Sequence, residues 1–140
     1  MPHLAKGASA YLTAQFLLLD WPLPDVIVPV PISFTRWFQR GYNQSFLLAS
    51  GLGEMINRPV QEALLRKSGD FSQAGLNHRQ RISLSGETIL MKKHQGLQDK
   101  CILLIDDVMT TGTTMHKCAE ALSEECPGRI YGLTLCHAIK

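Results

Sequence analysis

The chain has little net charge and no long hydrophobic run, and these absences exclude several classes of protein. Its 14 Lys and Arg against 12 Asp and Glu leave a formal net charge of only +2, which is too small for the whole molecule to attract nucleic acid electrostatically. The leading apolar run, Phe16–Leu19, is far too short to span a bilayer and lacks the flanks of a signal peptide. We therefore expect a cytoplasmic protein without a membrane span.

Metal and redox motifs are also missing. None of the four cysteines, Cys101, Cys118, Cys126 and Cys136, lies in a C-x-x-C spacing, and the five histidines are scattered, so neither a zinc site nor a thiol redox pair is indicated. Internal repeats and low-complexity tracts are absent as well. The remaining composition, 45% hydrophobic and 19% charged over 140 residues, fits one globular domain covering 1–140.

The first half of the chain predicts a helix, a strand and a second helix. A helix is expected from about Ala5 to Leu19, and residues 1–24 form an N-terminal helix and linker ended by prolines. Asp25–Val30 is β-branched and predicts a buried strand. A polar, basic loop, Ser33–Tyr42, should follow. Asn43 or Ser45 is then expected to cap a helix with Leu48, Leu52, Met55 and Ile56 on one face.

The second half predicts further strands around a long loop. Val60–Arg66 is expected to be a strand, and residues 67–98 a long functional or mobile loop with a helical tendency only near 77–84. Cys101–Ile105 should form an apolar strand, Asp106–Thr113 a turn, Thr114–Glu125 a helix and Arg129–His137 a final strand. This alternation predicts an α/β fold with a mainly parallel sheet flanked by helices.

The segment that follows the strand Cys101–Ile105 carries the functional argument. Ligands of parallel sheets bind beyond the carboxyl ends of strands. There, Asp106 and Asp107 can accept hydrogen bonds from a vicinal diol or attract Mg²⁺. The next residues open a helix, whose free amides favour a phosphate. The residues expected to bind that phosphate are Thr110, Thr111, Gly112, Thr113 and Thr114. A diol beside a phosphate cradle describes a ribose 5-phosphate.

This segment also fits two other interpretations. An ordinary strand, turn and helix could use these acids and threonines only as helix caps, an interpretation that the acid pair alone would favour. A magnesium-dependent NTPase could also carry an acid pair, but it would need a G-x-x-x-x-G-K-[ST] loop, and the sequence has none.

Asp106–Thr114 resembles the phosphoribosyl pyrophosphate loop of type I phosphoribosyltransferases, and other segments resemble the ComF/GntX family of competence-associated proteins. Val28-Pro29-Val30-Pro31 matches that family's Pro-Val-Pro strand end, and Arg40-Gly41-Tyr42-Asn43-Gln44 its Arg-Gly-aromatic-Asn-Gln segment. Gln73, Leu76 and Arg81 match its hood, a flexible loop over the site. The matches run from about Asp25 to His137. We expect this sequence to lack the family's N-terminal zinc module. Leu84 stands three residues after the hood arginine, where the family often has an asparagine.

The resemblance implies the type I phosphoribosyltransferase-like fold and binding of Mg²⁺-phosphoribosyl pyrophosphate or a related ribose phosphate. Asp106 and Asp107 would be the catalytic pair. The expected pyrophosphate-side ligands are Arg40, Gly41, Asn43 and, from the hood, Arg81. The family's association with natural transformation implies a link to DNA uptake. The acceptor and the oligomeric state are left open.

The main alternative is a non-catalytic competence protein that uses the same fold to bind single-stranded DNA or other competence proteins. The basic residues that would contact a single strand are Arg36, Arg40, Arg66, Lys67, Arg79 and Arg81. Trp21 and Trp37 are expected to serve in packing or loop anchoring rather than in base stacking. A nucleotide-sensing regulator with the same pocket is a third possibility.

Overall fold

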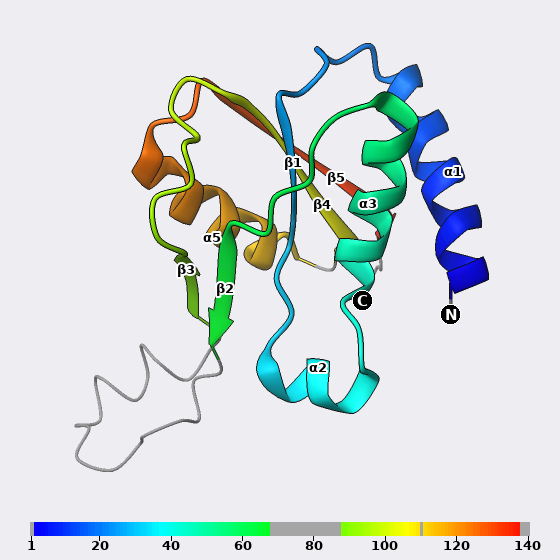
Figure 1. The fold of residues 1–140 in the computed structure, drawn as a ribbon, viewed down its shortest axis with the longest axis horizontal. Coiled ribbons are helices and arrows are strands. Elements are labelled where there is room, and N and C mark those ends of the chain that lie inside the picture. The colour runs from blue at the N-terminus through cyan, green and yellow to red at the C-terminus, as the bar shows by residue number, and fades with distance from the viewer. Residues whose placement is uncertain (1, 68–87, 110, 138–140) are drawn as a thin grey trace.

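The centre of the molecule is a sheet of three parallel strands (Figure 1). The computed structural model describes residues 2–67, 88–109 and 111–137. The sheet has the order β1-β4-β5, with bounds Val26–Pro29, Cys101–Met109 and Arg129–His137. In the register of the pairs, Val28 lies opposite Leu104, and Ile105 lies opposite Leu133. The predicted α/β fold with a parallel sheet is therefore confirmed.

Helices cover both faces of this sheet, which explains why its strands are continuously apolar. Helices α1 (Pro2–Leu18) and α3 (Gln44–Ile56) lie side by side on one face, and α5 (Thr113–Leu122) lies on the other (Figure 1). Side chains alternate between the faces. Ile27, Leu103 and Ile105 pack towards α1 and α3, whereas the neighbouring positions Val28 and Leu104 pack towards α5.

The segment between β1 and α3 differs from the prediction. It contains a short helix, α2 (Phe34–Arg40), where a loop over Ser33–Tyr42 was expected. The Ser33 side chain accepts a hydrogen bond from the Arg36 backbone N–H at 3.3 Å. Gly41 ends the helix with a φ of 79° and donates its N–H to the Trp37 carbonyl at 2.6 Å. A cap at each end therefore stabilises a helix too short for an amphipathic pattern to reveal.

Helix α3 confirms the predicted cap and most of the predicted face. Asn43 is its N-cap and accepts from the Ser45 backbone N–H at 3.0 Å. Leu48 and Leu52 are fully buried, whereas Met55 is half exposed.

The strand predicted at Val60–Arg66 is only partly correct. Val60 forms a single parallel bridge to Ile27, and the strand β2 begins later and covers Leu64–Lys67. It pairs antiparallel with β3 (Thr88–Met91) as a two-stranded hairpin apart from the main sheet. β3 lies within the stretch 67–98, which was expected to be a loop, because its pairing partner lies far away in the sequence. Residues 68–87, including the predicted helical stretch, lie outside the described residues.

Strand β4 is longer than predicted, and this changes the setting of the acid pair Asp106 and Asp107. The strand runs to Met109 because parallel pairing with β5 continues, with Asp106 opposite Thr134. The turn predicted at Asp106–Thr113 therefore begins later. The following helix starts at Thr113 and ends at Leu122, and a 3₁₀ turn, Ser123–Glu125, completes the predicted helical span. Of the helices in the described parts of the chain, none has the length and apolar character needed to cross a bilayer.

Candidate functional site

The acid pair Asp106 and Asp107 lies where β4 leaves the hydrophobic core. Asp106 is only 8% exposed, and Asp107 is half-buried. One carboxylate oxygen of Asp106, Oδ1, accepts a hydrogen bond from Ser45 Oγ at 3.2 Å and another from the Asp107 backbone N–H at 2.8 Å. Ser45 belongs to the first turn of α3, so this bond ties the end of β4 to a helix 61 residues away in the sequence. These two hydrogen bonds thus orient the Asp106 carboxylate.

Burial perturbs the ionisation of Asp106. Loss of solvent, followed by the influence of the adjacent Asp107 carboxyl, raises the pKa of Asp106 to about 6 from its ordinary value of 3.8. The hydrogen bond from Ser45 acts in the opposite direction. A carboxyl group that titrates near neutrality at the mouth of a cleft is typical of functional sites.

Residues 111–114, the described part of the threonine loop (110–114), line a cleft that begins at Asp106. This cleft has a volume of about 40 Å³, and its lining includes Thr111, Gly112, Thr113 and Thr114. Gly112 has a φ of 84° and precedes the first residue of α5. The amides of that first turn have no partner within the helix and can donate to an anion. The structure therefore brings four of the five predicted phosphate-binding residues to one cleft beside Asp106, and Thr110 lies outside the described residues.

A second cleft, of about 30 Å³, opens on the other side of Asp106, and we call it the arginine cleft. It is lined by the end of β1, by α2, by the start of α3 and by β2. Its charged and polar lining residues are Arg36, Arg40, Asn43, Gln44, Ser45, Arg66, Asp106 and Asp107. Arg40 and Asn43 therefore meet the acid pair at the same sheet edge, as predicted. Three cations opposite two carboxylates make this cleft suitable for a phosphate that brings its own counter-ion.

Asn43 and Gly41 have positions that explain more than ligand contact. The Asn43 side chain caps α3 and donates from Nδ2 to the Val30 carbonyl at 3.3 Å, so it holds the end of β1 against the start of α3. Gly41 ends α2 in a conformation that favours glycine. Asn43 lines the arginine cleft, whereas Gly41 is absent from its lining and lies between the cleft residues Arg40 and Asn43 at the end of α2.

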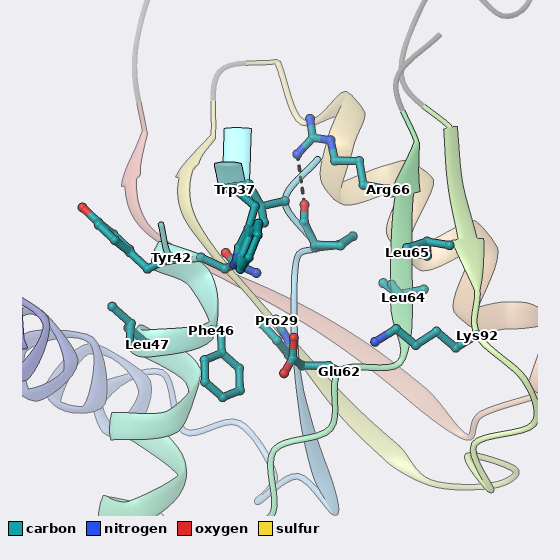
Figure 2. Close-up of a pocket in the computed structure, with 13 residues that line it drawn as sticks. Pro29, Trp37, Tyr42, Phe46, Leu47, Glu62, Leu64, Leu65, Arg66 and Lys92 are labelled. Carbon is teal, nitrogen blue, oxygen red and sulfur yellow. Dashed lines mark hydrogen bonds between the residues drawn. The ribbon is translucent and has the colours of Figure 1, made fainter. Parts of the chain in front are cut away.

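Arg66 was expected only as a possible contact for single-stranded DNA, and the structure places it beside the acid pair. Its Nη1 donates to the Pro31 carbonyl at 3.2 Å (Figure 2), and the residue lines the arginine cleft. Burial first, and then Arg36, lower the pKa of Arg66, while Asp106 and Asp107 act against that shift. Arg36 was likewise expected only as a single-strand contact and Ser45 only as a possible helix cap, whereas both line the arginine cleft. A serine in a helix start or an arginine on a strand becomes recognisable only when the fold brings it beside the acids.

Magnesium was expected with this acid pair. Within the described ranges, no group of three or more His, Cys, Asp or Glu is arranged to hold a metal ion. Two carboxylates are nevertheless enough protein ligands for a Mg²⁺ site, because this ion keeps several waters and takes further oxygens from substrate phosphates. Asp107, which is half-buried and lines the arginine cleft, is the carboxylate suited to ligate the ion. The remaining predicted ligand, Arg81, and its neighbours Gln73 and Leu76 lie outside the described residues.

Comparison with known proteins agrees with this geometry. Residues 43–139 match the family described as Phosphoribosyl transferase domain. A solved structure of a purine phosphoribosyltransferase from Pyrococcus horikoshii superposes with a TM-score of 0.57 at 19% identity, covering 95% of this chain and 72% of that one. The chain therefore belongs to the phosphoribosyltransferase domain family and has its fold.

Curated relatives narrow the assignment to the ComF-type members of that family. The chain is 37% identical over 100 residues to competence protein ComFC of Bacillus subtilis, covering 71% of this chain and 39% of that protein. It is 32% identical over 120 residues to the DNA utilization protein YhgH of Salmonella typhi, covering 84% of this chain and 52% of that protein. The chain thus spans only about half, or less, of the length of these relatives.

Proposed function

We propose that the chain binds Mg²⁺-phosphoribosyl pyrophosphate or a related ribose 5-phosphate, and that it catalyses, or derives from a protein that catalysed, phosphoribosyl transfer. The observation that carries this proposal is the position of Asp106, which lines both the cleft of the threonine loop and the arginine cleft. A sugar held at Asp106 can place a phosphate in the first cleft and a pyrophosphate in the second. Few other ligands combine a diol with anions on both sides.

The residues would divide the work as follows. Asp106 and Asp107 accept hydrogen bonds from the ribose hydroxyls and stabilise the positive charge that develops at C1′. The α5 amides and the threonine hydroxyls hold the 5-phosphate. Arg36, Arg40 and Arg66 hold the pyrophosphate, the hood residue Arg81 is proposed to cover it, and bound Mg²⁺ would add neutralisation of its charge.

In the transfer itself, an acceptor lone pair forms a bond to C1′ as the bond from C1′ to the pyrophosphate oxygen breaks. The electron pair of the broken bond leaves with pyrophosphate, and the acceptor loses a proton to solvent or to a base. The acceptor would approach from the face opposite the arginine cleft, because the leaving group occupies that cleft.

Calorimetry with Mg²⁺-phosphoribosyl pyrophosphate tests the binding proposal. The double variant Asp106→Asn, Asp107→Asn keeps the shape of both side chains but removes their charges, and we expect it to bind at least about 100-fold more weakly. Circular dichroism should show an unchanged fold. Equal affinity of the wild type and the double variant would refute the proposal.

Catalysis is tested separately by measuring pyrophosphate release with a panel of nucleobases and amines as acceptors. Release that depends on one acceptor and disappears in the double aspartate variant would establish transferase activity. Binding without release for any acceptor would leave a ligand-binding protein derived from a transferase.

A second candidate function is non-catalytic binding of single-stranded DNA or of a competence partner. Helix α2 favours it, because Trp37 and Phe38 are 48% and 76% exposed there and lie between Arg36 and Arg40 in the sequence. Exposed aromatic rings beside arginines suit stacked bases and their phosphates, whereas Trp37 was expected only to pack or anchor a loop. Relatives named for competence and DNA utilization are consistent with this candidate.

Binding of a labelled single strand over a range of salt concentrations tests this second function. Affinity that falls steeply as salt rises would support it. No binding even at low salt would remove direct DNA contact from consideration.

A further inference from the structure

A larger pocket adjoins the arginine cleft, and none of the roles proposed above uses it. It has a volume of about 460 Å³ and lies between α2, α3 and the β2–β3 hairpin (Figure 2). We call it the aromatic pocket. This volume is within the range of about 300–1,000 Å³ that is usual for sites of small organic ligands.

The pocket offers flat apolar surfaces together with a few polar groups. Trp37 of α2 and Phe46 of α3 lie on one side, and Leu64 of β2 lies on the opposite side (Figure 2). Glu62 and Lys92 are exposed residues on its lining. This combination suits a planar ring that stacks on aromatic side chains and carries hydrogen-bonding groups at its edge. A purely aliphatic ligand would not use the charged groups.

The aromatic pocket and the arginine cleft share part of their walls. Pro31, Ile32, Asn43 and Arg66 line both. A ligand with a ring in the pocket can therefore extend its anionic end towards Arg66 and, beyond it, towards Arg36 and Arg40. A ring joined to phosphate groups is the chemistry of a nucleotide.

The position of the aromatic pocket also excludes one role for a ring bound there, that of the acceptor. It adjoins the cleft in which the proposed function places the pyrophosphate leaving group, whereas an acceptor attacks C1′ from the opposite face. The ring is therefore not the acceptor of a phosphoribosyl transfer. A nucleotide bound here would occupy the arginine cleft with its own phosphates and exclude phosphoribosyl pyrophosphate.

We propose that the aromatic pocket holds the base of a nucleotide whose phosphates occupy the arginine cleft, so that nucleotides compete with the ribose-phosphate ligand. The pocket itself is independent of the proposed function. The competition rests on that function, because it requires phosphoribosyl pyrophosphate to use the same arginines.

Trp37 fluorescence provides a direct measurement with ADP as the probe. The chain has two tryptophans, and Trp21 stacks on Tyr131 at a centroid distance of 5.0 Å. A Trp21→Phe background keeps an aromatic ring at that position and leaves Trp37 as the sole tryptophan. We expect ADP to quench its emission, and phosphoribosyl pyrophosphate, which has no base, to reverse the quenching by displacement.

Calorimetry on substitutions at Trp37 then measures the contribution of the ring. Trp37→Ala should weaken ADP binding about 10-fold, as expected for loss of one stacking contact, and Trp37→Phe should restore most of the affinity. The matched control is Phe38→Ala, since Phe38 is an exposed aromatic on the same helix that is not part of the pocket lining. It should leave ADP affinity unchanged, and Trp37→Ala should change phosphoribosyl pyrophosphate affinity less than about 2-fold.

The outcomes separate this inference from the proposed function. Equal loss of ADP affinity in Trp37→Ala and Phe38→Ala, or no ADP binding while phosphoribosyl pyrophosphate binds, would overturn the proposed binding of a free nucleotide. Either result would leave the proposed function standing. ADP binding that depends on Trp37, without binding of phosphoribosyl pyrophosphate, would overturn the proposed function and keep the pocket.

A final arm distinguishes a free nucleotide from a nucleotide within a strand. An eight-residue deoxyadenosine oligonucleotide is titrated against the same variants. Binding of the oligonucleotide but not of ADP, with the same dependence on Trp37, would overturn the proposed free nucleotide and its competition, and would assign the aromatic pocket to the bases of single-stranded nucleic acid.

Discussion

The two halves of the candidate site are built in different ways. The acid half comes from one continuous segment, in which β4 delivers Asp106 and Asp107 and α5 begins a few residues later. The arginine half is assembled from separate segments, with Arg36 and Arg40 on α2, Ser45 on α3 and Arg66 on β2. The acid half is therefore visible as a motif, whereas the arginine half depends on tertiary packing. The following predictions test whether the halves also differ in function.

The largest effect is expected from removing charge in the arginine half. The double variant Arg36→Gln, Arg40→Gln should weaken phosphoribosyl pyrophosphate binding about 30-fold, because charge-assisted hydrogen bonds to the pyrophosphate are lost. Ribose 5-phosphate, which lacks that group, should lose less than about 3-fold. Calorimetry with both ligands measures the ratio, and Arg129→Gln, at the start of β5, serves as a control. Equal losses for the two ligands would show that the arginine half does not bind the pyrophosphate group specifically.

The second effect concerns the buried acid Asp106. Because its pKa is raised to about 6, the unfolded chain releases this proton at lower pH than the folded protein does. The free energy of unfolding should therefore fall as the pH rises from about 4 to about 6, by on the order of 2 kcal/mol from this group. Urea denaturation across this range should show the fall as a difference between the wild type and Asp106→Asn.

In Asp106→Asn this contribution disappears, so the variant should be the more stable protein above pH 6. Parallel stability curves for the two proteins would mean that Asp106 is not perturbed by burial. Other carboxyl groups, including Glu125, whose pKa is lowered mainly by backbone hydrogen bonds, contribute equally to both curves and cancel.

A third effect is expected at the start of α5. Gly112→Ala introduces a side chain at a φ of 84° and should cost about 1.5 kcal/mol of stability. Gly7→Ala is the matched control, because Gly7 lies within α1 and an added Cβ would meet nothing within 4 Å. That control should be neutral or stabilising by up to about 1 kcal/mol. Thermal denaturation of both variants checks the opposite signs.

The smallest effect is expected at the junction between the halves. Asn43→Ala removes the cap of α3 and the hydrogen bond to Val30, which should cost about 1 kcal/mol. Asn43→Asp keeps an acceptor for the Ser45 N–H and loses only the donor to Val30, so it should cost less. Chemical denaturation distinguishes the two variants, and equal costs would mean that the cap contributes nothing.

Sequence alone predicted the parts of the molecule that depend on local pattern. The apolar strands β1, β4 and β5, the helices α1 and α3 and the order of these elements follow from hydrophobic periodicity and from caps such as Asn43. The acid pair and the threonine loop were recognisable because strand, acids and helix start are contiguous. The parallel sheet then fixed the edge at which Arg40 would meet them.

What sequence analysis missed depends on contacts between distant segments. Helix α2 has only seven residues and exists through its two caps, so no periodic pattern indicates it. β3 pairs with a strand more than 20 residues earlier in the chain. Arg66 and Ser45 are ordinary residues in sequence and gain their roles from the acids beside them. The continuation of β4 through Asp106 depends on pairing with β5, which no local signal contains.

The prolines of β1 have one more consequence, for association between molecules. On the edge of β1 that faces away from β4, Ile27 makes two backbone hydrogen bonds. Its N–H donates to the Pro59 carbonyl at 2.9 Å, and its carbonyl accepts from the Gln61 N–H at 2.9 Å. Past Ile27, the next backbone nitrogens on that edge belong to Pro29 and Pro31 and carry no hydrogen. An extended segment from a second molecule therefore finds no donor there, and edge-to-edge aggregation is disfavoured along this side of the sheet.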